Sequence, residues 1–408
     1  MFKQYFKFIV RKLSRNRVYT VINIVGLSIA FSAAWLIYSH TSNEWNMDGY
    51  LKNSDNIYRV ITRYGDEDFW NCRTNTPFGP AAKRTFPEIV QVARYFQKDY
   101  RIKIKDDQDF TIEPKLAFVD PPFFDLFEIP VIQGKIDTTV FSWIVFTETS
   151  AKRYFNKENP IGKTVTIKDG INNRKKDIKC QVVAVIKDFP ANSTIQANII
   201  VDCRQGIPYF DEHRGNYSLY TYFHILPTAD LRAIEKKLPT IASNMPDDVN
   251  HYSHRLQPLK DIYFHSDHLR EDELLRGSQS LTYLLWSITI LILLLAAGNF
   301  LLIRIAQQDR DSSRFAIHKC YGASNKHLFY QLLGEIGLQT GVILLLSCIL
   351  TYGLHPYFIQ ILSPEHIYPF ELFNLSNFVF VGFICLIMGI ICSILYFHFK
   401  HHVSREGV

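Results

Sequence analysis

The sequence lacks the short motifs by which many enzymes and metal sites are recognised. Its 7 cysteines include no C-x-x-C pair, which excludes a zinc or dithiol redox site of that type. A G-x-S-x-G elbow, an H-E-x-x-H motif and a glycine-rich dinucleotide turn are also absent. We therefore expect that the chain catalyses no covalent reaction and binds no cofactor of its own.

Some segments suggest a site but lack one of its parts. Gly162, Lys163 and Thr164 match the end of a phosphate-binding loop, but that loop needs a glycine where this chain has Lys157. Three residues could ligate a metal, although without a fourth partner in view a solvated loop is the preferred interpretation: His265, Asp267 and His268. A disulfide is left open among Cys72, Cys180 and Cys203.

Charged residues are scarce in four stretches of about 20 residues, the length that crosses a hydrocarbon core of about 30 Å. The sequence therefore predicts four transmembrane α-helices, at residues 18–40, 281–304, 331–354 and 376–399. Buried core helices are the alternative, but such helices seldom stay apolar on every face for so long.

Acidic residues are absent before the first stretch, and basic residues are absent between the third and the fourth. By the positive-inside rule, the amino terminus, the connection 305–330 and the tail 400–408 lie in the cytoplasm, whereas residues 41–280 and 355–375 lie outside. The net charge of +6 follows from this orientation, so we do not expect nucleic-acid binding.

Residues 1–17 place aromatic and aliphatic side chains at helical spacing opposite Lys3, Lys7 and Arg11. This pattern predicts an amphipathic helix that lies among the membrane lipids of the inner leaflet, with a disordered basic tail as the alternative. The apolar run that follows is too long for a cleaved signal peptide, so we expect an uncleaved anchor.

The outer block, residues 41–280, alternates between strand and helix signals. Thr147 and Asp230 are placed to cap helices. Runs of β-branched or aromatic residues predict strands at 56–64, 100–105, 110–119, 177–186 and 220–226. We expect a large α+β extracytoplasmic domain with two lobes.

Seven segments, taken in order, carry a family resemblance. They are residues 22–38, 123–135, 145–167, 182–195, 256–266, 293–306 and 315–335. Together they resemble the permease subunits of the bacterial FtsX/MacB-like family of ABC transporters, which includes macrolide-exporting and lipoprotein-releasing permeases. The resemblance implies an inner-membrane protein with four spans and a MacB-like periplasmic core domain between the first and second spans. Hydropathy and charge predict the same topology independently.

The connection between the second and third spans, residues 305–330, holds the candidate coupling segment. Asp311 or Ser312 can cap a short helix, Gly322 suits its end, and Ser324 can cap a helix that continues into the third span. The resemblance implies that this is the coupling helix that docks on the ATPase. The candidate ATPase-coupling residues are Arg314, Phe315, Ile317, His318, Lys319, Tyr321, Gly322 and Ala323.

The coupling segment departs from the family pattern. The family usually has Glu-Ile-Gly-Val-Arg-Lys at the position of residues 314–319. This chain has Arg314 in place of the glutamate and Ala316 in place of the glycine. The dock is therefore altered here or shared with a more typical second permease. A basic loop that only fixes topology is the alternative interpretation.

Four residues of the predicted spans are candidates for helix packing or function. Gly26 and Ala30 form a small-xxx-small face, and Asn299 can hydrogen-bond between helices. Glu335 matches the family's glutamate and costs about 3 kcal/mol in hydrocarbon, so we expect it to face protein or the interface. Packing within one subunit and dimerisation both remain open.

The resemblance implies a non-catalytic permease subunit that transmits mechanical force. Its expected partners are two copies of an ABC ATPase that uses ATP and Mg²⁺, a second permease in a homodimer or heterodimer, and a periplasmic adaptor. The expected function is movement of the periplasmic domain for export or extraction of a peptide, macrolide, lipid or lipoprotein. The alternatives are a non-transporting, FtsX-type regulator of a cell-wall hydrolase and a membrane receptor without an ATPase.

Overall fold

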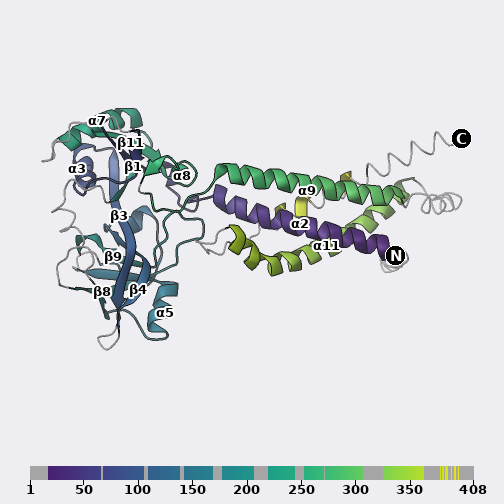
Figure 1. The fold of residues 1–408 in the computed structure, drawn as a ribbon, viewed down its shortest axis with the longest axis horizontal. Coiled ribbons are helices and arrows are strands. Elements are labelled where there is room, and N and C mark those ends of the chain that lie inside the picture. Colours follow the sequence, from purple (N-terminus) through teal and green to yellow (C-terminus); the bar gives the residue numbers. More distant parts are fainter. Residues whose placement is uncertain are drawn as a thin grey trace. The chain divides into compact units, whose positions relative to one another are not determined.

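The computed structural model describes residues 17–65, 68–104, 109–137, 142–168, 177–205, 219–243, 252–270, 272–306 and 325–362, and single residues between Asn377 and Ile394. They divide into two compact units (Figure 1). The globular unit is Asn46–Ser278, and the helical unit combines Met1–Trp45 with Gln279–Val408.

The globular unit is built on one twelve-stranded sheet in the described part of the chain. Its strands are β1 (Ile57–Tyr64), β2 (Trp70–Asn71), β3 (Ile89–Lys103), β4 (Thr111–Val119), β5 (Val131–Gly134), β6 (Trp143–Thr147), β7 (Thr164–Ile167), β8 (Ile178–Ile186), β9 (Ile199–Asp202), β10 (Tyr220–Ile225), β11 (Tyr252–Pro258) and β12 (Leu269–Arg270). Their order is β12-β2-β1-β10-β3-β4-β9-β6-β8-β5, with β11 beside β1, and β7 beside β3 and β8. Four of these strands, β1, β4, β8 and β10, confirm the runs predicted from the sequence, whereas the run predicted at 100–105 covers only the last four residues of β3 and misses its first eleven.

Strand β3 joins the two halves of this sheet. Its first half pairs with β10 and its second half with β4, both antiparallel, and Tyr95 pairs with Tyr220 on one side and with Val119 on the other. Figure 1 shows β3 running through the unit as a single long strand. The backbone hydrogen bonds of one strand therefore hold both halves together.

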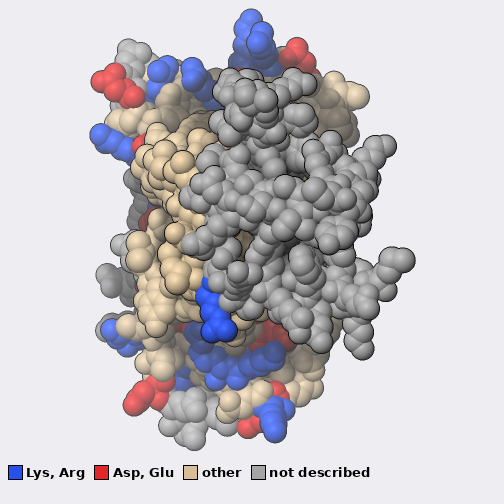
Figure 2. Space-filling view, turned by 90° about the vertical axis from the view of Figure 1, so that its right-hand side faces the viewer, with Lys and Arg blue, Asp and Glu red and all other residues tan. Residues whose placement is uncertain are grey.

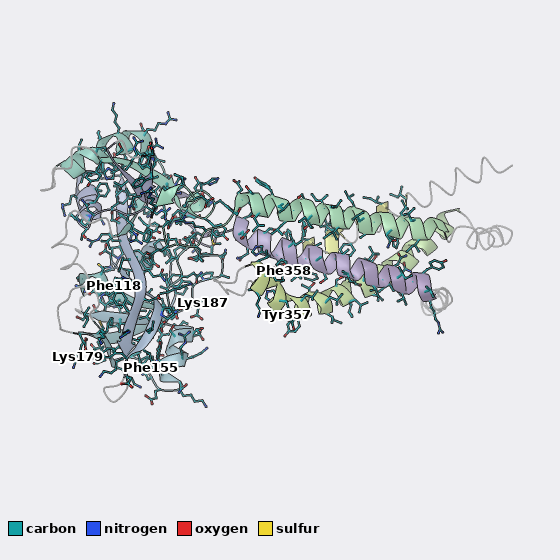
Figure 3. All side chains as sticks on the ribbon, viewed as in Figure 1. Phe118, Phe155, Lys179, Lys187, Tyr357 and Phe358 are labelled. Carbon is teal, nitrogen blue, oxygen red and sulfur yellow. The ribbon has the colours of Figure 1, made fainter. Side chains whose placement is uncertain are left out.

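The two faces of the sheet differ. One face carries a continuous core that draws residues from both halves, such as Ile57, Tyr95 and Val145. On the other face the core is divided. One cluster packs under α3 (Phe78–Thr85) and α7 (Leu231–Ser243), and another packs under α5 (Glu148–Phe155). The predicted two lobes thus correspond to two clusters on one face of a shared sheet; Phe118 and Phe155 mark the second cluster in Figure 3.

The predicted helix caps are confirmed. The Thr147 hydroxyl accepts a hydrogen bond from the Ser150 N–H at the start of α5. The Asp230 carboxylate accepts hydrogen bonds from the N–H groups of Arg232 (3.0 Å) and Ala233 (3.2 Å), at the start of α7. Shorter helical turns connect the strands: α4 (Phe123–Leu126), α8 (Leu259–Ile262), η1 (Ser54–Asn56) and η2 (Cys203–Gln205).

The open questions about cysteines and metal ligands are answered for the described residues. The three cysteines of this unit are free and buried, so no disulfide joins them: Cys72, Cys180 and Cys203. Side chains at 265, 267 and 268 are exposed, and no group of potential ligands among the described residues could hold a metal. In Figure 2, Lys and Arg side chains are interspersed with Asp and Glu on the described surface.

The helical unit contains three described helices that are long and apolar enough to cross a membrane. They are α2 (Arg17–Trp45), α9 (Gln279–Ala306) and α11 (Asn325–Leu362), and they include the first three predicted spans. The fourth predicted span lies largely outside the described residues. Its described residues are helical, and Asn377 donates a hydrogen bond to the Ser39 hydroxyl of α2. The count of four spans stays a prediction.

Candidate functional site

Hydrogen bonds between α2 and α11 fix the relative direction of these helices. The Ser347 hydroxyl donates to the Ser28 carbonyl oxygen (3.1 Å), and four residues further along both helices the hydroxyls of Thr351 and Ser32 are 3.1 Å apart. Because the contacts advance in the same direction on both helices, α2 and α11 run parallel. On α9, Phe300 shares a hydrophobic cluster with Leu27 of α2, and Thr282 hydrogen-bonds to Glu44 of α2. Higher residue numbers on α2 thus face lower numbers on α9, so the two helices run antiparallel.

These directions separate the two ends of the helical unit. One end holds the beginning of α2, the end of α9 and the beginning of α11. The other end holds Trp45 and Gln279, whose neighbours in the chain are the first and last residues of the globular unit. The connection 307–324 lies outside the described residues, but it joins the end of α9 to the beginning of α11. The coupling segment and the globular unit therefore attach to opposite ends of the bundle.

The end of the bundle next to the globular unit is tied together by side chains. Glu44 accepts a hydrogen bond from the Thr282 hydroxyl (2.9 Å), and its other carboxylate oxygen lies 3.3 Å from His40 Nε2. The rings of Trp45 and Tyr283 meet edge to face, with centroids 5.9 Å apart. The last turn of α2 and the first turn of α9 are thus connected by both polar and aromatic contacts.

The chain that follows α2 is anchored within the globular unit by Asp48. The Asp48 carboxylate accepts hydrogen bonds from the Thr194 hydroxyl (2.6 Å) and the Thr194 N–H (3.0 Å), and the Asp48 N–H donates to the Asn192 carbonyl oxygen (2.7 Å). Burial raises the pKa of Asp48 to about 6, although the hydrogen bonds from Thr194 oppose this rise. We call Asp48, Asn192 and Thr194 the entry anchor.

The chain that precedes α9 is anchored by Asp272. Its carboxylate lies 2.9 Å from the Arg59 guanidinium, and both side chains are fully buried. Arg59 also donates to Gln257 (2.7 Å) and Ser266 (2.9 Å), so its donors are shared among several acceptors. We call Asp272, Arg59 and Gln257 the exit anchor.

Comparison with known families identifies this combination of units. Residues 20–241, more than half of the chain, match the MacB-like periplasmic core domain, and residues 286–400 match the FtsX-like permease C-terminal domain. The chain belongs to the FtsX/MacB-like permeases of ABC transporters. Such permeases are inner-membrane components with a periplasmic domain, and they are generally non-catalytic and work with an ABC ATPase.

Three solved structures are similar to about half of this chain. A domain of a putative permease protein from Porphyromonas gingivalis has 18% identity and a TM-score of 0.44, covering 54% of this chain and 95% of that one. The periplasmic region of MacB from Actinobacillus actinomycetemcomitans has 15% identity and a TM-score of 0.36, covering 51% and 91%.

The extracellular domain of the noncanonic ABC-type transporter YknZ from Gram-positive bacteria has 13% identity and a TM-score of 0.36, covering 50% of this chain and 100% of that one. No curated protein gives a significant match. The identification therefore rests on the two family matches.

The structure describes only some of the candidate residues that the sequence analysis named in this permease. Residues 314–323, the candidate coupling residues, lie outside the described residues. Gly26 is exposed with open space around it, whereas Ala30 is buried. The Asn299 side chain is exposed on α9. Glu335 lies in α11, and its side chain lies outside the described residues.

Sequence reasoning missed the polar contacts that hold the permease together. The four-residue spacing of Ser28 and Ser32 on α2, and of Ser347 and Thr351 on α11, was a signal that could have indicated a shared helix interface. The two anchors gave no such signal because their partners are far apart in the sequence.

Proposed function

We propose that this permease couples ATP hydrolysis by a separate ABC ATPase to movement of its periplasmic globular unit, for export or extraction of a substrate. The observation that carries this proposal is the separation of the two attachment points, because the coupling segment joins one end of the bundle and the globular unit joins the other. Force applied at one end must pass along the helices to reach the globular unit. ATP and Mg²⁺ would be bound by the partner.

Helix α11 supports this direction of coupling. It has 38 residues, which at 1.5 Å per residue gives about 57 Å, well above a hydrocarbon core of about 30 Å. Its described residues include Gly337–Leu362, a candidate membrane span. The helix is therefore longer than one membrane crossing needs, and we expect the excess to extend beyond the bilayer. Pro356 lies inside the helix near its end, so we expect the stretch before Pro356 to carry a displacement as one piece.

The hydroxyl contacts between α2 and α11 would pass that displacement to α2. Ser28 and Ser32 are fully or almost fully buried against α11, where interhelical hydrogen bonds stabilise one register of the two helices. The contacts of Glu44 and Trp45 with α9 would then move both helix ends together. The expected result is movement of the globular unit as one body.

The remaining partners belong to the same proposal. A second permease copy or a related permease would complete the assembly with two ATPase copies, and a periplasmic adaptor would receive an exported substrate. Gly26 and Asn299, exposed on α2 and α9, are available for contacts with that second permease. The class of substrate stays open among peptides, macrolides, lipids and lipoproteins.

Co-purification in mild detergent tests the proposal. We expect the wild-type chain to retain an ATPase that contains a phosphate-binding loop, and Arg314→Glu/Lys319→Glu to lose most of it. The matched control is Lys179→Glu, a charge reversal at an exposed position of β8 (Figure 3). Absence of any ATPase from the wild-type sample would contradict the proposal. A cell-wall hydrolase that co-purifies with the ATPase would support the regulator in its place.

A further inference from the structure

The connections between the helical unit and the globular unit contain almost no free chain. Helix α2 ends at Trp45, and the carbonyl oxygen of the next residue, Asn46, accepts a hydrogen bond from Asn192 Nδ2 (2.8 Å). Before α9, the Gly277 N–H donates to the Tyr263 carbonyl oxygen (2.9 Å). The helix begins two residues later, so a single residue, Ser278, separates the last anchored position from α9.

Close packing around Gly277 fixes the connection that precedes α9. A Cβ atom on Gly277 would lie 2.1 Å from the ring of Tyr263, which no side chain could occupy without displacing one of the two segments. The chain at this point is therefore tightly packed within the globular unit, one residue before it ends.

The entry anchor and the exit anchor attach to different parts of the sheet. Asp48 binds the loop between β8 and β9, whereas Asp272 binds Arg59 of β1, which in turn binds Gln257 of β11. In the sheet order, β10, β3 and β4 lie between β1 and β9. The two anchors therefore hold the globular unit through different segments of its fold.

Two anchored connections constrain a body differently from one. A single flexible linker transmits a pull but lets the attached body rotate freely, whereas two short connections to different segments also transmit rotation. We propose that Asp48 and Asp272 are positioning residues that make the globular unit turn with the ends of α2 and α9. This inference deepens the proposed function, and its use in transport rests on that function.

The chemistry of the anchors fits a positioning role. A buried ion pair adds little net stability compared with apolar residues of similar size, because desolvation of both charges offsets their attraction, although loss of Asp272 would leave the buried Arg59 charge unpaired. Their hydrogen bonds are directional, however, and so is the pair of bonds from Thr194 to Asp48. Directional bonds fix the orientation of a chain that apolar contacts would leave adjustable.

Distance measurements between the two units test the inference. Spin labels would be introduced through unnatural amino acids at two exposed positions, Lys237 of α7 and Leu291 of α9, in the full chain in lipid nanodiscs. We expect a narrow distance distribution for the wild-type chain. Asp48→Ala and Asp272→Ala should each broaden that distribution at least two-fold, because each frees one connection.

A matched control separates positioning from stability. Asp120 also forms a largely buried ion pair, 2.7 Å from Arg94, but it is not part of either anchor. Asp120→Ala should lower the melting temperature of the full chain and leave the width of the distance distribution unchanged. Equal broadening in the Asp120 variant would overturn the inference, because the anchors would then act only through stability.

Insertions test the same point without removing an anchor. Four residues, Gly-Ser-Gly-Ser, placed between Trp45 and Asn46 should broaden the distribution at least two-fold, and the same insertion between Asn172 and Asn173, in the connection from β7 to β8, should not. The inference would be wrong if the wild-type distance distribution were as broad as that of the variant with the insertion after Trp45. The distance measurement needs no ATPase. If no ATPase co-purified, the proposed function would be contradicted, but the widths of the distance distributions would still test the role of the anchors.

Discussion

The buried carboxylate of Asp48 is expected to make the stability of the folded protein depend on pH. It is 1% exposed, and no basic side chain among the described residues forms an ion pair with it. Its pKa of about 6 lies above the value near 3.9 of an unfolded chain, so the folded state binds the proton more tightly. The stabilisation from protonated Asp48 is therefore complete below about pH 3.9 and is lost as the pH rises through about 6.

Asp48→Asn should remove this dependence. A shift of about two pKa units corresponds to about 3 kcal/mol, so between pH 4 and pH 7.5 the free energy of unfolding of the wild-type chain should fall by up to that amount relative to the variant. Asparagine suits the position because it tolerates the positive φ of 53° found there. Thermal unfolding of the full chain in detergent at both pH values measures the difference. Asp125→Asn, at an exposed position of α4, is the control and should track the wild type.

At the scale of single elements, the α2 and α11 pair depends on small polar side chains. Ser347 donates to the carbonyl oxygens of both Ser28 and Ile343, and it is fully buried. A bilayer offers no water to replace such a bond, and lipid tails drive helices together less than water does. Close approach and hydrogen bonding therefore decide which faces of these helices meet.

Ser347→Ala should destabilise the helical unit by about 1 kcal/mol, since it removes the interhelical hydrogen bond but keeps the close approach. Ser347→Leu should cost more, because its larger side chain cannot fit where Ser28 and Ser347 meet. Unfolding of the full chain in detergent, followed by far-ultraviolet circular dichroism, measures both. Ser287→Ala on the exposed part of α9 serves as control, and a loss at that position equal to the loss at 347 would contradict the explanation.

At the scale of the whole molecule, the charge pattern and the helix directions together predict the membrane topology. Basic residues cluster before the first span and between the second and third. The helix directions place the beginning of α2 and the beginning of α11 at one end of the bundle, and Gln279 at the other. Only the charge pattern says which end is cytoplasmic.

Side-specific labelling checks this topology. Cysteines placed at Arg17 and Asn325 should react with a membrane-impermeant reagent only from the cytoplasmic side, and a cysteine at Ser280 only from the periplasmic side. Reaction of all three from one side would show that the helix directions are wrong. Reaction from the opposite sides would show that the charge pattern is misleading for this chain.

The fold was predictable wherever a local pattern sufficed. The strand over residues 57–64 and the caps at Thr147 and Asp230 follow from side-chain alternation and from hydrogen bonds to neighbouring N–H groups, which depend on a few consecutive residues. The division of the core into two clusters on one face was only partly visible, as two lobes. It depends on how strands distant in the sequence pair, and β3 gives no sign that it serves both halves.

The sequence by itself determined that this chain has long apolar helices, a large α+β block between two of them and a family pattern along nearly its whole length. Hydropathy, charge and capping are properties of neighbouring residues, so they are present in the sequence before any folding. The tertiary structure alone decided which residues tie the helices and the connections in place. Ser28 meets Ser347 across 319 positions and Asp48 meets Thr194 across 146, and such partners are chosen by the packing of whole elements.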